Sequence, residues 1–374
     1  MKKTKIVHIL HSVGGVDVSL RLILENCNAS EFENIVIHGI NDTKDLFYDI
    51  QSAVIKEYKL PISREISLID DLRAILKTYS IITKEKPDLI HAHSAKGGVI
   101  GRVIGLLTGI KVLYTPQAFS YLSTSNKIKR KSFLLIEKLL SKGNTLLLAS
   151  SPSEMVRGIY EVGFTFNKTQ LFNNAIMPIT EILPLSIETT WPQNYICTVG
   201  RPCYQKNIVE MIEVFYEVRK AKDIHLLLMG VGHHSDQLKS VKKQISDLGL
   251  NSHVTLLNWT SRSDVLNIIS KAKIYISTAR YEGLPYSVIE SLSLGIPCVV
   301  SDCDGNRDLI TDNYNGYVIK DNNIIDFSSK IIKLLNDEIL YKKFSDHSKK
   351  TFEKHFNMKE NIQQLEAIYL KNKK

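Results

Sequence analysis

The chain has few cysteines, and their spacing does not suggest a structural framework. Five cysteines occur in 374 residues, and no two of them form a Cys-x-x-Cys pair. An odd number without framework spacing is typical of proteins from a reducing compartment. The cysteines therefore do not point to metal or redox chemistry, and the sequence favours a cytoplasmic location.

Long hydrophobic runs are also missing. No apolar segment reaches the roughly 18–20 residues that a membrane-spanning helix needs. The basic start is followed by only one short apolar segment, Ile6–Leu10, which His8 interrupts. This segment is too short for a signal peptide, and we expect a first β-strand there. The length favours two domains, and the composition, with 44% hydrophobic and 23% charged residues, is that of an ordinary globular protein.

The common nucleotide-binding fingerprints are absent as well. There is no Gly-x-Gly-x-x-Gly with a trailing acidic residue, which argues against a dehydrogenase, and no P-loop. No zinc-finger or RRM signature occurs, so nucleic acid is not an expected partner. Strands and helices nevertheless alternate over nearly the whole chain, and this pattern predicts an α/β fold.

One stretch in the second half carries the strongest signal. Ile274–Ser277 and Cys298–Ser301 have the pattern of buried strands. Between them, Pro285 fits the first turn of a helix, and Gly295 followed by Pro297 fits its end. The stretch therefore predicts a strand, a turn, a helix and a second strand.

Two carboxylates flank the start of this predicted helix. The backbone N–H groups of Gly283 and Leu284 would lie at the helix N-terminus, which suits a phosphate. A phosphate repels carboxylates, so Glu282 and Glu290 are better suited to accept hydrogen bonds from hydroxyl groups beside it. A phosphate between two hydroxyl-bearing groups describes a nucleotide-sugar.

These residues resemble a known family. Glu282-Gly-Leu-Pro, the second carboxylate Glu290 and the following Gly-Ile-Pro-Cys-Val-Val are similar to the paired-glutamate signature of glycosyltransferase family 4. The resemblance implies retaining enzymes of the GT-B fold, in which two Rossmann-like domains face each other across a cleft and the C-terminal helix crosses back to the first domain. It also implies metal-independent transfer without a cofactor.

The resemblance assigns further donor-binding residues. Arg201 and Lys206 follow the first strand of the predicted second domain and would clamp a diphosphate. Gly230 and Gly232 follow the next strand and would flank the nucleotide. In the first domain, the loop with Gly14 and Gly15 follows the first strand, and in the family such a loop lies against the donor phosphates and the acceptor. The donor set thus comprises Gly14, Gly15, Arg201, Lys206, Gly230, Gly232, Glu282, Gly283, Leu284, Pro285 and Glu290.

The predicted acceptor site lies in the first domain. His91 and His93 stand at the end of a strand and would point the same way, as a pocket wall or in a structural role. A His-x-His pair can also bind a metal, but no third ligand is evident. Gln117 occupies a position where the resembled subgroup usually has histidine followed by glycine. Glutamine cannot titrate, so it can position a substrate but cannot act as a general acid or base.

The catalytic prediction therefore comprises Glu282, Gln117, Arg201 and Lys206, with Glu282 holding sugar hydroxyls. No carboxylate is placed as an obvious nucleophile, which favours a front-side displacement in which the donor phosphate takes the acceptor proton.

Positive charge is concentrated in the first half of the chain. The net charge is +9 overall, with +7 in residues 1–176 and +2 in residues 177–374. A dense basic cluster is opposed only by Glu137 and comprises Lys127, Lys129, Arg130, Lys131, Lys138 and Lys142. Lys127 and Arg130 are assigned to the acceptor site. The cluster suits an anionic membrane or a pyrophosphate-linked acceptor, and a solvated helix face is the alternative.

Two patterns concern helix packing in the first domain. Residues 68–83 predict an amphipathic helix whose apolar face comprises Leu68, Leu72, Ile75, Leu76 and Ile82. Glycines recur every four residues at positions 97, 101, 105 and 109. Because the run is too short to span a membrane, we interpret these glycines as permitting close packing on the sheet.

The domain boundaries follow from these elements. We expect an acceptor-binding Rossmann-like domain over residues 1–178 and a proline-rich linker over 179–193. A nucleotide-sugar-binding Rossmann-like domain follows over 194–355. Residues 356–374 form a helix that packs back on the first domain through Ile362, Leu365, Ile368 and Tyr369.

The sequence thus predicts a hexosyltransferase that moves a sugar from a nucleotide diphosphate, UDP rather than GDP, to a saccharide acceptor. The acceptor is expected to be lipid-linked, in the assembly of capsule, O-antigen or exopolysaccharide, with peripheral contact at the inner face of the cytoplasmic membrane. A nucleotide-sugar epimerase and a non-catalytic binding homologue remain alternatives. Asp302 and Asp304 form an Asp-x-Asp pair, so a metal-dependent transferase of the other major fold is a further alternative.

Overall fold

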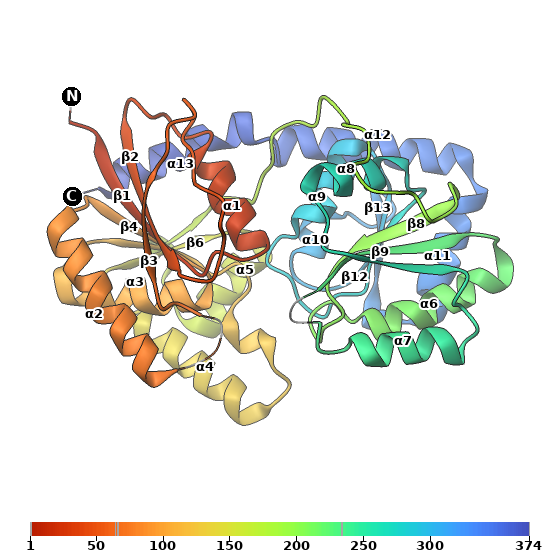
Figure 1. Ribbon diagram of the computed structural model, residues 1–374, viewed down its shortest axis with the longest axis horizontal. Coiled ribbons are helices and arrows are strands. Elements are labelled where there is room, and N and C mark those ends of the chain that lie inside the picture. Colours follow the sequence, from red (N-terminus) through yellow and green to blue (C-terminus); the bar gives the residue numbers. More distant parts are fainter. Residues whose placement is uncertain (1, 64, 66, 233–234, 374) are drawn as a thin grey trace. The chain divides into compact units, whose positions relative to one another are not determined.

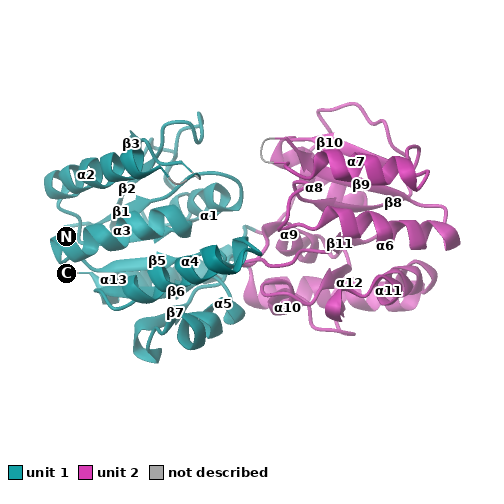
Figure 2. Cartoon of the chain, turned by 90° about the horizontal axis from the view of Figure 1, so that it is seen from below, with its two compact units in different colours: residues 1–177, 357–374 teal, residues 178–356 magenta. Residues whose placement is uncertain are grey.

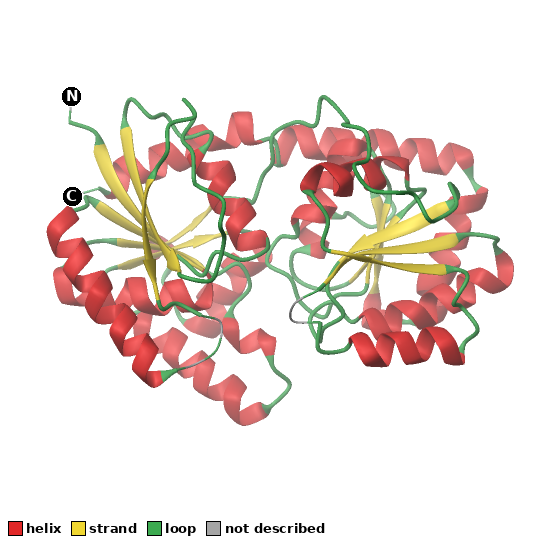
Figure 3. Cartoon of the chain, in the orientation of Figure 1, coloured by secondary structure: helices red, strands yellow, loops and turns green. Residues whose placement is uncertain are grey.

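Strands and helices alternate through almost the whole chain in the computed structural model, as the sequence predicts (Figures 1 and 3). The structure describes residues 2–63, 65, 67–232 and 235–373. The chain divides into two compact units (Figure 2): unit 1 comprises residues 1–177 and 357–374, and unit 2 comprises residues 178–356. Each unit is built around its own parallel sheet.

Unit 1 contains a seven-stranded sheet in the order β3-β2-β1-β4-β5-β6-β7. The strands are β1 (Thr4–Ile9), β2 (Phe32–Gly39), β3 (Lys56–Leu60), β4 (Leu89–His93), β5 (Val112–Thr115), β6 (Thr145–Ala149) and β7 (Thr169–Leu171). The helices are α1 (Gly15–Leu24), α2 (Leu68–Glu85), α3 (Ser94–Thr108), α4 (Lys127–Leu140), α5 (Pro152–Arg157) and the C-terminal α13 (Met358–Asn372).

The two faces of this sheet bury different side chains, because neighbouring residues of a strand point to opposite faces. Val7 and Ile9 of β1 pack with side chains of α2 and α3. His8 lies on the other face, where the Tyr369 ring of α13 approaches it. Helices α2, α3 and α4 therefore form one outer layer, and the views in Figures 1 and 2 agree.

The glycines of α3 allow it to lie directly on the sheet. A Cβ atom at Gly97 would overlap the Ile9 carbonyl oxygen, and one at Gly101 would overlap Ala92. Gly105 is similarly close to Val112. The prediction of close packing on the sheet is therefore confirmed for these three glycines, whereas Gly109 has open space around it and is the left-handed C-cap of the helix.

Helix α2 differs from the expectation. Ile82 is buried and Ile75 is partly buried, but Leu68, Leu72 and Leu76 are 85%, 57% and 61% exposed. The apolar residues thus form two stripes, and only the one that contains Ile75 and Ile82 faces the sheet. The prediction of a single buried face was wrong because periodicity shows that apolar stripes exist but does not identify which one is covered.

Unit 2 contains a six-stranded sheet in the order β10-β9-β8-β11-β12-β13. The strands are β8 (Tyr195–Val199), β9 (His225–Val231), β10 (Val254–Asn258), β11 (Tyr275–Ser277), β12 (Cys298–Ser301) and β13 (Gly316–Ile319). The helices are α6 (Ile208–Ala221), α7 (Leu238–Asp247), α8 (Arg262–Lys271), α9 (Tyr286–Leu294), α10 (Asn306–Leu309), α11 (Ile324–Asn336) and α12 (Glu338–His355).

The segment predicted as a linker belongs to unit 2, which begins at Pro178. The Ser186 N–H and hydroxyl each donate to the Asp264 carboxylate at 2.7 Å, and the Asn267 amide donates to the Leu183 carbonyl at 2.6 Å. Trp191 is buried. Residues 179–193 are thus held on α8, which their irregular sequence does not reveal.

Helix α13 belongs to unit 1 although unit 2 precedes it in the chain. Its buried residues include all four predicted contacts, Ile362, Leu365, Ile368 and Tyr369. The Asn28 N–H also donates to the Glu366 carboxylate at 2.7 Å. None of the helices in the described part of the chain combines the length and the apolar character needed to cross a bilayer.

The packing of α13 predicts a difference between two leucines of this helix. Leu365 is fully buried and Leu370 is 39% exposed. We expect Leu365→Ala to lower the unfolding free energy of unit 1 by about 2–5 kcal/mol, since it leaves a cavity, whereas Leu370→Ala should cost less than about 1 kcal/mol. Denaturant unfolding with hydrogen exchange resolved by unit measures both. Equal effects of the two substitutions would contradict the packing of α13 on unit 1.

Candidate active site

The loops at the carboxyl ends of the strands contain most of the predicted site residues. In an open parallel sheet, ligands bind at this edge, where the strand order reverses. In unit 2 the order reverses between β8 and β11. The loops that follow these two strands, residues 200–207 and 278–285, therefore flank the expected ligand position.

An ion pair joins these two loops. The Lys206 Nζ lies 2.7 Å from the Glu282 Oε1, and the Gln205 amide donates to Glu282 Oε2 at 3.1 Å. Glu282 is 7% exposed. Burial by itself disfavours the charged form of Lys206, but the adjacent Glu282 carboxylate outweighs it and raises the lysine pKa above its ordinary value. Lys206 is therefore a permanent cation at the carboxyl edge.

Backbone contacts also hold the two loops together. The Arg280 N–H donates to the Gln205 carbonyl at 2.8 Å, and the Thr278 hydroxyl donates to the Asn207 carbonyl at 3.0 Å. Arg280 Nη1 reaches the Tyr204 carbonyl at 2.7 Å. The cation and the carboxylate thus lie on loops whose relative positions are fixed.

The glycines near this ion pair leave space for it and for a ligand. A Cβ atom at Gly200 would lie 3.0 Å from the Lys206 Cγ, so the lysine stem crosses Gly200 closely. Gly230 has a positive φ of 97°, which a side chain would strain. Its neighbour in space is the Gly200 backbone. Arg201 is partly exposed and makes no ion pair with a described residue, so its guanidinium is available to an anion.

Helix α9 begins one residue later than expected. Tyr286 is its first residue and Pro285 is the N-cap, whereas the sequence predicts Pro285 inside the first turn. Gly283 and Leu284 consequently precede the helix. A proline N-cap supplies no side-chain acceptor for the first-turn N–H groups. Glu282 and Gly283 lie in the loop that leads directly into this N-terminus.

Glu290 lies inside α9 and pairs with Arg262 of α8. Arg262 Nε and Nη2 both lie 3.2 Å from Glu290 Oε1. Burial raises the pKa of Glu290, and Arg262 opposes this shift. Among the described residues, only Oε1 of Glu290 has a partner, so Oε2 can accept hydrogen bonds from a ligand. Arg262 and Gln205 were not predicted. Each is distant in sequence from the glutamate that it contacts, and no spacing marks either contact.

The Asp302-Cys-Asp304 motif lies beside this site but holds its own cation. Arg307 Nε donates to Asp302 Oδ1 and Arg307 Nη1 donates to Asp304 Oδ1, both at 2.7 Å. Gly305 follows, and a Cβ there would lie 2.7 Å from the Gly283 carbonyl oxygen. The guanidinium thus occupies the position between the carboxylates, and the motif packs against the Glu282–Gly283 turn.

In unit 1 the loop after β5 has unusual backbone geometry. Gln117 and Ala118 have φ values of 52° and 78°, in the left-handed region that costs non-glycine residues energy. The Ala118 N–H donates to Glu154 Oε1 at 2.7 Å, and the Ser150 N–H donates to Glu154 Oε2 at 2.7 Å. Glu154 thus holds this loop to the end of β6. The Gln117 Nε2 is buried without a hydrogen-bond partner among the described residues.

The positive φ at Ala118 explains the family pattern at this position. Glycine tolerates this conformation freely, and the resembled subgroup usually has glycine here. The chain retains the backbone conformation despite the alanine, with Glu154 as the anchor.

His91 and His93 are interior residues, and the structure corrects their assignment to the acceptor site. They are 1% and 0% exposed and form a buried cluster with His8. His91 Nδ1 lies 2.8 Å from the Tyr369 hydroxyl, and His91 Nε2 lies 3.0 Å from the Thr115 hydroxyl. Helix α13 covers these rings, so a saccharide cannot contact them without displacing it.

The cluster has a definite hydrogen-bond order. Because His8 Nε2 donates to the Asn34 amide oxygen at 3.1 Å, His8 Nδ1 must accept from His93 Nε2, also at 3.1 Å. Ring nitrogens of all three histidines lie within 4.8 Å of one another, a spacing that a metal could use. Both ring nitrogens of His8 and of His91 are nevertheless already engaged in hydrogen bonds, which a metal would have to displace.

Lys127 and Arg130 lie in the first turn of α4 and are exposed. The Arg130 guanidinium lies 5.9 Å from the centre of the Tyr121 ring. Neither side chain makes a hydrogen bond or ion pair with Gln117. They form part of a surface rather than of an enclosed pocket.

Gly14 and Gly15 lie at the switch point of unit 1, where the strand order reverses between β1 and β4. Gly14 has a φ of 62° and is the N-cap of α1, and Gly15 is the first residue of that helix. The loop after β1 thus reaches the carboxyl edge of the sheet. This is the edge at which Gln117 follows β5.

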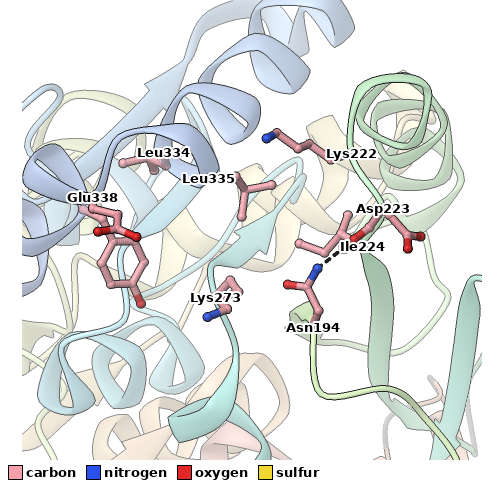
Figure 4. Close-up of a pocket in the computed structure, with 9 residues that line it drawn as sticks. Asn194, Lys222, Asp223, Ile224, Lys273, Leu334, Leu335 and Glu338 are labelled. Atoms are coloured by element: carbon pink, nitrogen blue, oxygen red, sulfur yellow. Dashed lines mark hydrogen bonds between the residues drawn. The ribbon is translucent and has the colours of Figure 1, made fainter.

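A cavity of about 470 Å³ lies elsewhere in unit 2 (Figure 4). Asn194, Ile224 and Lys273 line it, and each precedes a strand of the sheet. The cavity therefore opens at the amino ends of β8, β9 and β11, the edge opposite Lys206 and Glu282. It contains none of the predicted site residues.

Comparison with known proteins identifies the family. A family model described as glycosyl transferases group 1 matches residues 187–351, and one described as glycosyl transferase 4-like domain matches residues 14–174. The chain belongs to glycosyltransferase family 4. The two matched regions fall in unit 2 and unit 1 respectively, apart from the ends of each unit. The protein is therefore a glycosyltransferase, and the resemblance drawn from the paired glutamates is confirmed.

Two curated relatives match over nearly their full length. The chain is 25% identical over 384 residues to the *Escherichia coli* UDP-Gal:alpha-D-GlcNAc-diphosphoundecaprenol alpha-1,3-galactosyltransferase, covering 98% of this chain and 97% of the relative. It is 25% identical over 388 residues to the capsular polysaccharide biosynthesis glycosyltransferase CapM of *Staphylococcus aureus*, covering 99% and 97%.

Solved structures confirm the GT-B fold. Sucrose-phosphate synthase from *Thermosynechococcus elongatus* matches with a TM-score of 0.83 at 16% identity, covering 99% of both chains. *Anabaena* HepE in complex with UDP-glucose matches with a TM-score of 0.79 at 16% identity, covering 98% of this chain and 99% of the other. The predicted architecture of two Rossmann-like domains is thus confirmed.

The histidine cluster of the glycosyltransferase predicts a pH dependence of stability. Burial lowers the pKa of His8 from 6.5 to about 4 in the folded state and also lowers those of His91 and His93. The unfolded chain therefore binds more protons below pH 6.5. We expect stability to fall as the pH falls from about 6.5 toward 4, with His8 alone contributing about 3 kcal/mol.

Denaturant unfolding at several pH values measures this dependence. His8→Gln, which retains a polar amide in the cluster, should flatten the curve between pH 6.5 and 4. An unchanged slope in this variant would contradict the assignment of a neutral, buried His8.

Proposed function

We propose that this glycosyltransferase transfers a hexose-type sugar from a UDP-sugar to a lipid-linked saccharide in surface-polysaccharide assembly. The observation that carries the proposal is the Lys206–Glu282 ion pair at the switch point of unit 2. The names of the *E. coli* and *S. aureus* relatives, which include UDP-galactose, a diphosphoundecaprenol acceptor and capsule biosynthesis, support the donor and acceptor classes. The UDP-glucose complex of HepE supports the uridine donor.

The donor diphosphate is assigned to Arg201 and Lys206. Lys206 donates one of its three N–H groups to Glu282, which leaves two for phosphate oxygens. Arg201 adds a planar fork of donors. The N-terminus of α9, beside Gly283, supplies further positive potential. Together these groups stabilise the charge that develops on the leaving UDP.

The carboxylates are assigned to the two sugars of the donor. Glu282, held by Lys206 and Gln205, accepts hydrogen bonds from hydroxyls of the transferred sugar. Glu290 accepts them from the ribose through Oε2, the oxygen that Arg262 leaves free. Gln117 donates a hydrogen bond from its unpartnered Nε2 to the sugar or the acceptor.

We propose that transfer retains the anomeric configuration by front-side displacement. The acceptor oxygen forms its bond to the anomeric carbon as the bond from that carbon to the phosphate oxygen breaks. The leaving phosphate takes the acceptor proton. Gln117 cannot titrate, and no carboxylate is assigned as a nucleophile, so this route requires no protein acid or base.

The reaction is proposed to be independent of metal ions. In enzymes that use Asp-x-Asp, a divalent cation joins the carboxylates to the diphosphate. Here Arg307 pairs with both Asp302 and Asp304. Arg201 and Lys206 supply the positive charge for the diphosphate instead.

Nucleotide binding tests the donor site. We expect UDP at a concentration of 100 Kd to stabilise the folded protein by about 2.7 kcal/mol and therefore to raise its melting temperature, both with and without EDTA. GDP, ADP and CMP should shift it less. Glu290→Ala should weaken UDP binding because the ribose loses its acceptor, whereas Glu338→Ala, at the opposite edge of the sheet in unit 2, is the matched control.

A UDP shift that disappears in EDTA would contradict metal independence, and no shift with any nucleotide would contradict the donor site. Conversion of the UDP-sugar to its epimer without an acceptor would instead favour the epimerase alternative. Unchanged UDP binding in Glu290→Ala would refute the ribose assignment.

We further propose that unit 1 contacts anionic lipids at the inner face of the cytoplasmic membrane. The contact surface is the outer face of α2, α3 and α4, which we call the basic apolar face. Its exposed apolar residues are Leu68, Ile69, Leu72, Leu76, Tyr79, Leu106, Leu107, Ile128, Leu135, Ile136 and Leu139. Lys127, Lys129, Arg130, Lys131 and Lys138 are exposed on α4.

The charge on this face is nearly uncompensated along α4. Glu137, the acidic residue of the cluster, is 1% exposed, and its Oε2 lies 2.9 Å from Arg102 Nη1 in the interior. It therefore does not neutralise the surface lysines. Apolar side chains between exposed basic residues suit a surface of anionic lipid, with which both contribute to binding.

Vesicle flotation tests the basic apolar face. We expect the protein to float with vesicles that contain phosphatidylglycerol and not with pure phosphatidylcholine. Lys131→Gln/Lys138→Gln should weaken binding roughly tenfold or more, since each basic residue near the surface contributes about 1 kcal/mol. Lys239→Gln/Lys242→Gln on α7 of unit 2 removes the same charge elsewhere and should have little effect. Equal losses in both double variants would contradict the assignment to this face.

A further inference from the structure

The loop after β1 brings an imidazole to a buried carboxylate. His11 Nδ1 lies 2.7 Å from Asp42 Oδ1. The Asp42 side chain is 1% exposed, and its Oδ2 accepts the Ser12 N–H at 2.5 Å and the Gly39 N–H at 2.8 Å. The His11 side chain is 21% exposed. The aspartate is thus fixed from three directions, and the histidine reaches from it toward the surface.

The contacts of Asp42 determine the tautomer of His11. Burial alone would raise the pKa of Asp42, but the hydrogen bonds from His11 and from the Ser12 and Gly39 N–H groups outweigh it and lower the pKa. The carboxylate is therefore ionised and only accepts hydrogen bonds. His11 Nδ1 must therefore carry a proton, which it donates to Asp42, and Nε2 is the ring nitrogen left for a ligand. This Nε2 has no hydrogen-bond partner among the described residues.

The position of His11 in the sheet points to a ligand. It follows β1 at the switch point of unit 1, where β1 and β4 are neighbours and the strand order reverses. Gly14, with its positive φ, follows in the same loop. Gln117 lies at the same carboxyl edge, after β5. The oriented imidazole therefore lies at the edge of unit 1 where a substrate is expected.

The chemistry of Nε2 selects the kind of group that it can bind. The ionised Asp42 carboxylate beside the ring leaves the His11–Asp42 pair without net positive charge, so the pair does not attract a phosphate. A saccharide hydroxyl is uncharged and can both donate and accept a hydrogen bond, so it is complementary to Nε2. A diphosphate is instead complementary to Arg201 and Lys206 in unit 2.

We propose that His11 is an acceptor-binding residue, whose Nε2 forms a hydrogen bond with a hydroxyl group of the acceptor saccharide, and that Asp42 positions its ring. The inference rests on the proposed function, because it assigns the saccharide of that reaction to this loop. It adds an acceptor contact in unit 1 to that of Gln117.

A purely structural role would consist only of neutralising Asp42, and two substitutions separate the roles. His11→Asn places an amide nitrogen near the position of Nδ1, so the hydrogen bond to Asp42 is kept and Nε2 is lost. His11→Gln places a polar amide near the position of Nε2 and loses the bond to Asp42. If the role is structural, only His11→Gln should have an effect, and it should act on stability.

The experiment measures transfer from a UDP-sugar to a synthetic lipid diphosphate that carries N-acetylglucosamine. UDP-galactose, UDP-glucose and UDP-N-acetylglucosamine are the donors tested. We expect His11→Asn to melt at the wild-type temperature and to raise the acceptor KM about tenfold, as expected for the loss of one hydrogen bond, with the donor KM unchanged. His11→Gln should melt lower but recover part of the acceptor affinity.

His347→Asn is the matched control. His347 Nδ1 also has a fixed partner, the Tyr314 carbonyl at 2.8 Å, but it lies on α12 in unit 2. This variant should leave both KM values unchanged. It shows whether loss of a half-buried imidazole affects the assay through stability alone.

The outcomes distinguish the two proposals. If the wild type transfers sugar and His11→Asn has an unchanged acceptor KM, the assignment of His11 is overturned and the proposed function stands. A change in the donor KM alone would place His11 at the donor and also overturn the assignment. If the wild type transfers nothing from any of these donors while UDP still binds, the proposed function fails, and the assignment of His11 fails with it.

Discussion

The ion pair between Lys206 and Glu282 is the interaction on which the proposed donor site of this glycosyltransferase depends. It joins two loops that follow β8 and β11, strands that are adjacent only because the sheet order reverses there. Glu282 is buried, so its charge requires both Lys206 and Gln205. Loss of one partner from such a pair costs more than the pair contributes, because the remaining charge is left buried. The pair thus makes the position of each loop depend on the other.

This constraint extends to the neighbouring elements of unit 2. The Glu282–Gly283 turn leads into α9, which contains Glu290. The Gly283 carbonyl is in close contact with Gly305, so the loop after β12 must follow the same turn. Arg307 then neutralises the two aspartates of that loop. The N-terminus of α9, to which phosphate binding is assigned by proposal, and its flanking carboxylates are therefore held by contacts made mainly at one edge of the sheet.

Unit 1 uses buried carboxylates for a related purpose. Asp42 accepts hydrogen bonds from backbone N–H groups after β1 and at the end of β2. Glu154 accepts them from the N–H groups of Ala118 and Ser150, which follow β5 and β6. In both cases a carboxylate accepts hydrogen bonds from backbone N–H groups at or beyond the ends of the parallel strands. The polar side chains presented nearby, His11 and Gln117, owe their positions to these anchors. The hydrogen bonds of Glu154 also offset the conformational energy of the left-handed backbone at Gln117 and Ala118.

The sequence by itself determined the parallel α/β class, two Rossmann-like domains, the order of their elements and the family. These depend on local patterns: β-branched runs, glycine and proline at turns, and two glutamates at a fixed spacing. The close packing of α3 on the sheet could likewise be predicted from its glycines, because a residue without a side chain permits close approach whatever the helix packs against.

Only the tertiary structure decided which groups meet. Gln205 and Arg262 contact the paired glutamates, and Asp42 orients His11, across separations that no spacing encodes. It also decided which apolar stripe of α2 is covered and that His91 and His93 lie under α13, since helix periodicity and strand alternation identify faces but not their neighbours. The physical reason is that burial and charge pairing depend on segments far apart in the chain, whereas the sequence displays only the local preferences of each.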